Sequence, residues 1–227
     1  MKGWFITGTD TGVGKTLVTA ALCRAGRQRG HNWLPAKPVQ TGAPGPRSPD
    51  LDLCLSAASL TLPETLYNLL NPVRLPTPAS PHFAAELAGQ TLTLDPLLAS
   101  LRQAAGHADA LLVEGAGGIR VPLNHHHDLR DLMSALRLPV ILVARPSLGT
   151  LNHTRLSIDS LLAASLTPAA IVLTPRNFRD PIEDNNHATL TRLYPRLPLI
   201  NLPLLPFPLS APQALDPLGD LLYEALC

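Results

Sequence analysis

The sequence has no excess of positive or negative charge. Among its 227 residues, Lys and Arg together number 18, and Asp and Glu together number 17. Such a balance gives no electrostatic footprint for nucleic acid or for an anionic membrane. We therefore expect no nucleic acid and no membrane among the partners of this protein.

Cysteine is scarce, and long apolar runs are missing. The three cysteines, Cys23, Cys54 and Cys227, are widely spaced and odd in number. This pattern favours neither a disulfide framework nor a zinc site, and it fits a reducing compartment. The first residues, MKGWFITG, form too short an apolar run for a signal peptide. No stretch approaches the roughly 20 apolar residues that a membrane-spanning helix needs. A cytoplasmic location is therefore expected.

Hydrophobic residues and prolines are abundant. Hydrophobic residues make up 45% of the chain, which indicates a globular protein, and 227 residues suit a single domain over residues 1–227. Several of the 24 prolines crowd into Tyr194–Pro212. Interior prolines exclude a long helix or a central strand throughout that segment. We predict a short strand near Leu199–Asn201 followed by a rigid loop; an extended surface segment is the alternative.

Short apolar runs alternate with helical patterns along the chain. This alternation is typical of a parallel sheet with crossover helices, so we predict an α/β fold with a mostly parallel central sheet flanked by helices. The predicted strands are Trp4–Thr7, Leu34–Val39, Ala110–Glu114, Pro139–Ala144, Ala169–Thr174 and Leu199–Asn201. The predicted helices are Thr16–Arg29, Asp95–Ala105, Leu129–Leu136, Asn152–Ser165 and Glu183–Leu193.

The segment GTDTGVGKT, Gly8–Thr16, is a variant of the phosphate-binding loop and lies between a predicted strand and a predicted helix. Its first glycine comes one residue early, and a threonine stands where the usual pattern has glycine. Loop N–H groups and the positive end of the helix favour phosphate. Lys15 would reach the terminal phosphates, Thr16 would bind Mg²⁺, and Gly12 and Gly14 would allow close approach of the backbone. A glycine-containing turn without a ligand is the alternative.

Charged residues lie at two further strand ends. Glu114 closes ALLVE, where a buried carboxylate is costly unless it is paired or metal-bound, so a Mg²⁺ role is favoured over a role as a helix cap or turn acid. Lys37 closes the second strand and could aim its charge at a reacting phosphoryl group, although an isolated lysine is more often a surface charge. Asp50 and Asp52 precede a predicted helix, where either could be an N-cap or a metal ligand.

Four segments in this order resemble the dethiobiotin synthetase family: GTDTGVGKT, KPVQTG, VEGAGG and LGTLNHT, the last at Leu148–Thr154. SPHFAAE, Ser80–Glu86, is also similar to the substrate-side segment of that family. The resemblance extends from Gly8 to about Leu205, and the early glycine of the phosphate loop is a trait of the family. It implies a single-domain fold of the P-loop NTPase type.

The resemblance implies an ATP-dependent and Mg²⁺-dependent cyclo-ligase. The family joins CO₂ to 7,8-diaminononanoate and closes the cyclic urea of dethiobiotin, releasing ADP and phosphate. One amine becomes a carbamate, the carbamate attacks the γ-phosphate to form a carbamic–phosphoric mixed anhydride, and the second amine displaces phosphate. Mg²⁺, Lys15, Lys37 and backbone N–H groups would offset the repulsion between the two anions. The reaction requires no protein nucleophile, and the sequence offers no convincing one.

Carried over residue by residue, the resemblance implies four sets of site residues. The catalytic residues are Lys15, Lys37 and Thr11. The Mg²⁺ ligands are Thr16, Asp50 and Glu114, with Asp52 as the second choice to Asp50. The nucleotide-binding residues are Gly12, Val13, Gly14, Lys15, Thr16, Leu17, Asp50, Glu114, Gly115, Ala116, Gly117, Thr174, Pro175, Pro203, Leu204 and Leu205. The substrate-binding residues are Thr41, Ser80, Gly118, Gly149, Thr150 and Asn152.

One departure from the family pattern concerns the nucleotide base. The strand Ala169–Thr174 should end in a residue that reads the base, often Asn followed by Asp, but this chain has Thr174 and Pro175. Threonine has a single hydroxyl and proline has no N–H. We expect weak discrimination among ATP, CTP and GTP, unless Asn177 or Pro203–Leu205 compensates.

The resemblance further implies a homodimer with shared active sites. In the family, the carboxylate of the substrate is held at the corresponding helix start of the partner subunit. In this chain Asn152 is predicted to begin that helix, and a helix start favours anions. Asn152 could equally be a helix cap. In NHHHD, three adjacent histidines do not easily face one metal ion, and Asp128 is predicted as the N-cap of the next helix.

Two other functions compete with this interpretation. Switch ATPases that position other proteins share the phosphate loop, but they carry a second lysine near the start of the loop, where this chain has Thr9, Asp10 and Thr11. Many also have a basic or amphipathic surface tail, whereas QALDPLGDLLYEALC lacks positive charge. Other amide-forming ligases of the superfamily are usually longer, because they carry an added glutaminase domain that 227 residues cannot accommodate.

Overall fold

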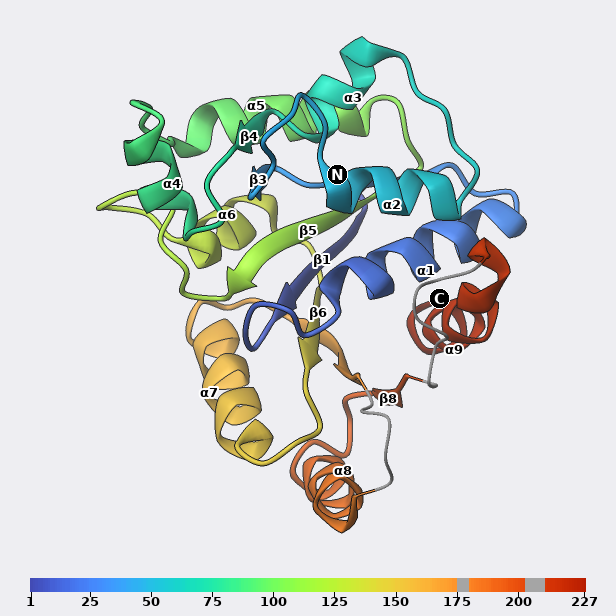
Figure 1. The fold of residues 1–227 in the computed structure, drawn as a ribbon. Coiled ribbons are helices and arrows are strands. Elements are labelled where there is room, and N and C mark those ends of the chain that lie inside the picture. The colour runs from blue at the N-terminus through green and yellow to red at the C-terminus, as the bar shows by residue number, and fades with distance from the viewer. Residues whose placement is uncertain (175–179, 203–210) are drawn as a thin grey trace.

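A parallel sheet forms the centre of the computed structural model (Figure 1). Over the residues that the structure describes, 1–174, 180–202 and 211–227, this sheet has six strands in the order β2-β5-β1-β6-β7-β8, and neighbouring strands are parallel. They are β1 Gly3–Gly8, β2 Trp33–Ala36, β5 Ala110–Gly118, β6 Val140–Ala144, β7 Pro168–Leu173 and β8 Leu199–Asn201. The predicted α/β fold with a parallel sheet is confirmed.

Helices cover both faces of the sheet. Helices α1 Lys15–Gln28 and α9 Asp216–Leu226 lie side by side over one face, and α5 Leu94–Ala105, α6 Leu129–Leu136 and α7 Thr150–Ala163 pack on the other (Figure 1). The remaining helices are α2 Pro49–Ala57, α3 Glu64–Leu70, α4 Pro81–Leu87, α8 Pro181–Leu193 and the short 3₁₀ helix Pro212–Leu215.

The strands are apolar on both faces because both faces are buried. Leu111 and Val113 of β5 belong to the core cluster under α5, α6 and α7, whereas Leu112 between them belongs to the cluster under α1 and α9. Phe5 and Ile6 of β1 divide in the same way. This period of two explains why the strands appear in the sequence as continuous hydrophobic runs.

Two predicted strand boundaries are wrong. The predicted strand Leu34–Val39 breaks after Ala36, and Val39–Thr41 forms β3, which pairs with β4, Val73–Leu75, in a separate small sheet. Pro38 has no N–H for a sheet ladder, and the N–H of Lys37 donates to Leu70 O at 2.8 Å instead. Glu114 does not end its strand, because β5 continues to Gly118.

The N-cap residues of the helices test several predictions. Asp128 is the N-cap of α6, as predicted, and forms a capping box with Asp131. Ser48 caps α2 through its side chain, so the alternative that Asp50 or Asp52 is the cap is wrong; both lie in the first helical turn.

Helix α7 begins two residues earlier than predicted. Gly149 is its N-cap, and the helix runs from Thr150, so Asn152 lies inside the first turn and is not the cap. In the proline-rich segment, the predicted strand Leu199–Asn201 is confirmed as β8, while residues 203–210 of the predicted loop lie outside the described residues. In the described part of the chain, no helix has both the length and the hydrophobicity needed to cross a membrane.

Candidate active site

The loop between β1 and α1 wraps around the Lys15 ammonium group. Lys15 Nζ donates a hydrogen bond to Asp10 O at 2.9 Å, and the Lys15 side chain is buried. A Cβ atom at Gly8 would lie 2.9 Å from Asp10 O and 3.2 Å from Lys15 Nζ. The early glycine is therefore required by close packing inside the loop. Thr9, which stands at the usual glycine position, has no positive φ and so accommodates a side chain.

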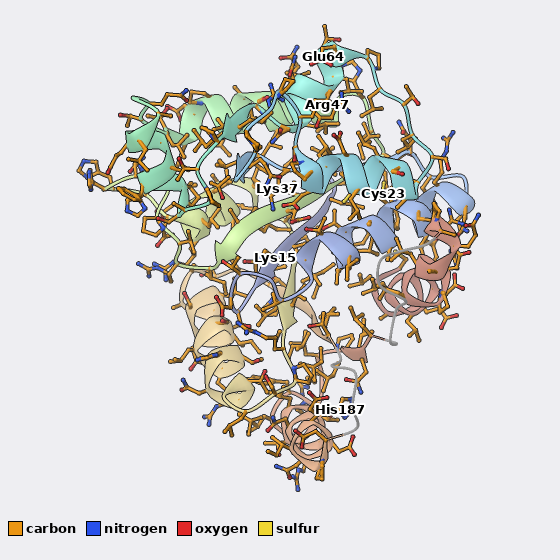
Figure 2. All side chains as sticks on the ribbon, viewed as in Figure 1. Lys15, Cys23, Lys37, Arg47, Glu64 and His187 are labelled. Carbon is orange, nitrogen blue, oxygen red and sulfur yellow. The ribbon has the colours of Figure 1, made fainter. Side chains whose placement is uncertain are left out.

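The surroundings of Lys15 disfavour its positive charge. Its pKa is lowered to about 8, chiefly because the ammonium is buried and next because the positive charge of Lys37 lies nearby; Glu114 and Asp50 partly offset these effects. Figure 2 labels both lysines, Lys15 at the start of α1 and Lys37 close to α2. Two buried cations so close together favour an anionic ligand such as a phosphate group.

Lys37 is held by a cluster of oxygen atoms. Its Nζ lies 2.7 Å from Glu114 Oε1 and 2.7 Å from Asp50 Oδ2, and it donates to Gly115 O at 3.0 Å. Thr16 Oγ1 donates to the same Glu114 Oε1 atom at 2.9 Å. Lys37 is 5% exposed and Glu114 is 2% exposed, so this ion pair is buried. We call these four side chains, Thr16, Lys37, Asp50 and Glu114, the charge cluster.

The charge cluster is suited to a cation. Burial by itself would lower the pKa of Lys37, but the charges and hydrogen bonds of Glu114 and Asp50 outweigh it and raise the pKa above its usual value. The two carboxylates converge on the Lys37 ammonium, and the hydroxyl of Thr16 contacts one of them, Glu114. Hydroxyl and carboxylate oxygens are the ligands that Mg²⁺ prefers, so the donor set fits this metal.

Three separate segments bring the charge cluster together. Lys37 follows β2, and its backbone is fixed by Leu70 O and by the side-chain amide of Asn71, which donates to Lys37 O. Asp50 comes from the first turn of α2. Glu114 comes from β5, opposite Ile6 of β1. The sheet order places β5 between β1 and β2, which sets Glu114 beside both the phosphate loop and Lys37.

A cavity of about 670 Å³, here called the lysine cavity, opens around these groups. The predicted site residues that line it are Thr11, Gly12, Gly14, Lys15, Thr16, Leu17, Lys37, Thr41, Asp50, Ser80, Glu114, Ala116 and Gly117. Val13 instead lies buried beneath the loop, and Gly115 contributes its carbonyl to Lys37. The structure therefore brings most of the predicted site residues together around one cavity.

Within this chain, the start of α7 does not line the lysine cavity. Thr150 lines a separate hollow of about 200 Å³ together with Asp10 and Arg145, which form an ion pair. Gly118 lines a groove of about 480 Å³ that also includes Thr11 and His153 and that we call the α7 groove. Of the predicted substrate residues at the start of α7, Thr150 thus lines a different hollow, and Gly149 and Asn152 do not line the lysine cavity.

The two candidate aspartates, Asp50 and Asp52, have different partners. Asp50 contacts Lys37, whereas Asp52 accepts hydrogen bonds from Arg47 at 2.7 and 3.1 Å and from the hydroxyl of Tyr67 at 3.0 Å. Asp52 is paired away from the charge cluster. The choice of Asp50 over Asp52 therefore agrees with the geometry.

Sequence reasoning missed several residues that line the lysine cavity. Gln40 is buried, donates to Thr41 O at 2.9 Å and accepts from Ser48 Oγ at 2.6 Å. It lies inside the segment KPVQTG, between the predicted site residues Lys37 and Thr41. This position is the sequence signal that could have identified Gln40. The other missed residues are Pro78, Ala79, Pro81 and Val121. Their side chains carry no polar group, and only Pro81 lies in a segment, Ser80–Glu86, that the resemblance marked.

Thr174 braces the phosphate loop. Its hydroxyl donates to Val13 O at 2.8 Å. A Cβ atom on Gly14 would lie only 2.6 Å from the methyl group of Thr174, so the loop has no room for a side chain at this position. Gly14 also has a φ of +98°, a conformation that favours glycine. Because the loop uses the only hydroxyl proton of Thr174, this hydroxyl has no further proton to donate to a base. Pro175, Asn177 and Pro203, Leu204 and Leu205 lie outside the described residues.

Comparison with known proteins gives matches over most of the chain. A family model described as an AAA domain matches residues 2–206. The ATP-dependent dethiobiotin synthetase BioD of Anaeromyxobacter sp. (strain Fw109-5) is 40% identical over 203 residues, covering 89% of this chain and 90% of the relative. The proteins of the same name from Ralstonia nicotianae and Xylella fastidiosa are 41% and 38% identical over 208 and 230 residues, covering 90% and 97% of this chain and 90% and 99% of the relatives.

A solved structure also resembles the whole chain. The ParA family ATPase from Chlorobium tepidum TLS gives a TM-score of 0.57 over 99% of this chain and 93% of that chain. The two sequences are only 17% identical, so this likeness shows a shared fold and nothing about activity.

The substitution Thr174→Val tests whether this residue braces the loop. It keeps the methyl contact with Gly14 and removes the hydrogen bond to Val13 O. We expect affinity for ATP, GTP and CTP to fall by one common factor of roughly three to ten, the net contribution of one hydrogen bond. Isothermal titration calorimetry measures all three affinities, with the exposed Thr61→Val as control. A change in the ratio among the nucleotides would assign Thr174 to base recognition instead.

Proposed function

The chain belongs to the ATP-dependent dethiobiotin synthetase family, and from this premise we propose that its lysine cavity binds the substrates and closes the ring. The enzyme is an ATP-dependent ligase of biotin synthesis. In the proposed reaction, CO₂ and 7,8-diaminononanoate give the cyclic urea of dethiobiotin. The observation that carries the proposal is the buried charge cluster directly beside the phosphate loop and Lys15.

The phosphate loop and the two lysines have different tasks in this proposal. Lys15 and the loop N–H groups bind the terminal phosphates of ATP, which supply the negative charge that two neighbouring buried cations favour. Lys37 stabilises the charge of the transferred phosphoryl group, and for this its ammonium exchanges a carboxylate partner for a phosphate oxygen. Thr16, Asp50 and Glu114 would hold Mg²⁺, which would supply further positive charge against the repulsion between the reacting anions.

The organic chemistry needs positioning and no covalent intermediate on the protein. One amine of the substrate takes up CO₂, loses a proton and becomes a carbamate. The carbamate oxygen attacks the γ-phosphate of ATP, ADP leaves, and a carbamic–phosphoric mixed anhydride forms. The second amine then attacks the carbonyl carbon of the mixed anhydride, and phosphate leaves. The hydroxyls of Thr11, Thr41 and Ser80 line the lysine cavity and are proposed to orient the carbamate and the amines. Ser80 supports this assignment, since its side chain makes no capping hydrogen bond to α4.

We further propose a single domain over residues 1–227 and a cytoplasmic location. Both core clusters draw on the strands of one central sheet, which supports one folding unit. Cys23 and Cys54 are buried free thiols, which fit a reducing compartment.

The surface beside the phosphate loop supports a homodimer with shared sites. Leu148 before α7 is 85% exposed and Leu156 on α7 is 60% exposed, and Leu156 also lines the α7 groove. Exposed apolar side chains next to a groove favour a protein partner, and a two-fold dimer places the same surface of each copy in contact. In such a dimer, the start of α7 from one copy would face the substrate of the other, where its free N–H groups favour the substrate carboxylate.

Direct product analysis tests the function. Incubation with diaminononanoate, bicarbonate, Mg²⁺ and ATP is expected to give dethiobiotin, detected by mass, together with ADP. For Lys37→Ala we expect kcat to fall by a factor on the order of 100 or more, and ATP affinity to change much less, because the charge acts mainly in the transition state. The exposed Lys2→Ala is the matched control. ATP hydrolysis without dethiobiotin in the wild-type protein would contradict the proposal.

Subunit mixing tests the shared site. One chain carries Lys15→Ala, and the other carries substitutions across Gly149–His153; each homodimer should be inactive. If each site takes Lys15 from one chain and the α7 start from the other, a heterodimer contains one site with both defects and one intact site. Activity should therefore return to about half of the wild-type value per heterodimer. Continued inactivity, with heterodimers identified by native mass spectrometry, would count against shared sites.

A further inference from the structure

The hydroxyl of Tyr67 lies outside the lysine cavity but connects segments that build the charge cluster. Tyr67 belongs to α3 and is 1% exposed. Its hydroxyl accepts the backbone N–H of Ser48 at 2.8 Å and donates to Asp52 Oδ1 at 3.0 Å. The single hydroxyl thus connects α3 to the N-cap residue of α2 and to a residue of its first turn.

The start of α2 is the part of the chain that carries Asp50. Ser48 caps this helix, accepting the N–H of Leu51 at 3.1 Å, and its hydroxyl donates to Gln40 Oε1 at 2.6 Å. Asp50 follows Ser48 by two residues and reaches Lys37 Nζ at 2.7 Å. The backbone position that Tyr67 holds therefore determines where the Asp50 carboxylate lies.

Arg47 completes the support around Tyr67. Its guanidinium group binds Asp52 and lies 4.0 Å from the centre of the Tyr67 ring. Figure 2 shows Arg47 beside Glu64 at the start of α3, and Arg47 Nη1 is 3.8 Å from Glu64 Oε2. Asp52 thus receives donors from both Arg47 and Tyr67, which fixes the orientation of the acceptor that the hydroxyl of Tyr67 uses.

The same helix also fixes the backbone of Lys37. Tyr67 O accepts the N–H of Asn71 at 3.0 Å, the side-chain amide of Asn71 donates to Lys37 O, and Leu70 O accepts the N–H of Lys37. Helix α3 therefore supports both partners of the Lys37–Asp50 ion pair, although Tyr67 itself lies outside the lysine cavity.

We propose that Tyr67 is a positioning residue for the metal site: its hydroxyl holds the first turn of α2 so that Asp50 faces Glu114 and Thr16. The inference rests on the proposed function, because it takes Asp50 as a Mg²⁺ ligand. Without the hydroxyl, the N–H of Ser48 is left buried without a partner, and the turn that carries Asp50 relaxes. The phosphate loop is unchanged, so Tyr67 acts on the metal and leaves metal-free nucleotide binding as it is.

The test uses Tyr67→Phe in the full-length protein and Mn²⁺ as a probe of the Mg²⁺ site. Electron paramagnetic resonance measures Mn²⁺ binding in the presence of a non-hydrolysable ATP analogue. We expect Tyr67→Phe to bind Mn²⁺ about three to ten times more weakly, the factor that corresponds to one hydrogen bond. Affinity for the analogue without metal should stay within about twofold, and kcat should recover at high Mg²⁺.

The matched control is Tyr223→Phe, which also removes a tyrosine hydroxyl from a hydrogen bond, here the 2.9 Å contact with His31. Tyr223→Phe should bind Mn²⁺ with the same affinity as the wild-type protein. Asp50→Asn tests the metal role of Asp50 separately from the positioning role of Tyr67, since it should weaken Mn²⁺ binding strongly. If Asp50→Asn binds Mn²⁺ as the wild type does, the metal role of Asp50 fails, and with it this inference.

If Asp50→Asn weakens Mn²⁺ but a folded Tyr67→Phe does not, only the positioning role of Tyr67 is overturned. Should Tyr67→Phe fail to fold by circular dichroism, Asp52→Asn decides the question. It keeps an acceptor oxygen but weakens the contact with Arg47 and Tyr67. Weaker Mn²⁺ binding by Asp52→Asn supports the inference, and wild-type binding overturns it.

Discussion

The rest of the site depends on one buried ion pair, between Lys37 and Glu114. A charge removed from water costs several kcal/mol unless an opposite charge and hydrogen bonds replace the lost solvation. Here Glu114, Asp50 and the carbonyl of Gly115 surround one ammonium group. Satisfying that ammonium requires β2, β5 and α2 to meet at a single point, and the same meeting forms the lysine cavity beside the phosphate loop.

The pair also supports the proposal that the site binds both a metal ion and a phosphate group. The oxygens that stabilise Lys37 are hard ligands, and a divalent cation would use the same oxygens. In the proposed reaction, Lys37 would then turn its charge to the phosphoryl group, while the metal would compensate the two carboxylates. Because the carboxylates must be placed to bind the cation, the position of Asp50 matters as much as its charge. The hydrogen bonds of Tyr67 and Ser48 at the start of α2 hold the backbone that carries Asp50.

Local pattern was enough for most of the fold and for part of the site. Apolar runs such as Ala110–Glu114 predicted the parallel sheet, and the phosphate loop follows directly from residues adjacent in sequence. The resemblance to the family favours Asp50, since nothing local distinguishes it from Asp52. The small sheet of β3 and β4 and the support from Tyr67 were missed, because they depend on contacts between residues far apart in the chain. Thr174 was placed at the right strand end, but its hydroxyl serves the loop.

A double-mutant cycle on Lys37 and Glu114 tests the central claim most directly. The free energy of unfolding is measured by urea for the wild type, Lys37→Met, Glu114→Gln and the double variant. Breaking one side of a buried pair should cost about 3 kcal/mol or more. Since the double variant leaves neither charge unpaired, its loss should fall short of the sum of the single losses by about 1 kcal/mol or more. Small single losses that simply add would show that the two charges are solvated independently, and the account built on the buried pair would be wrong.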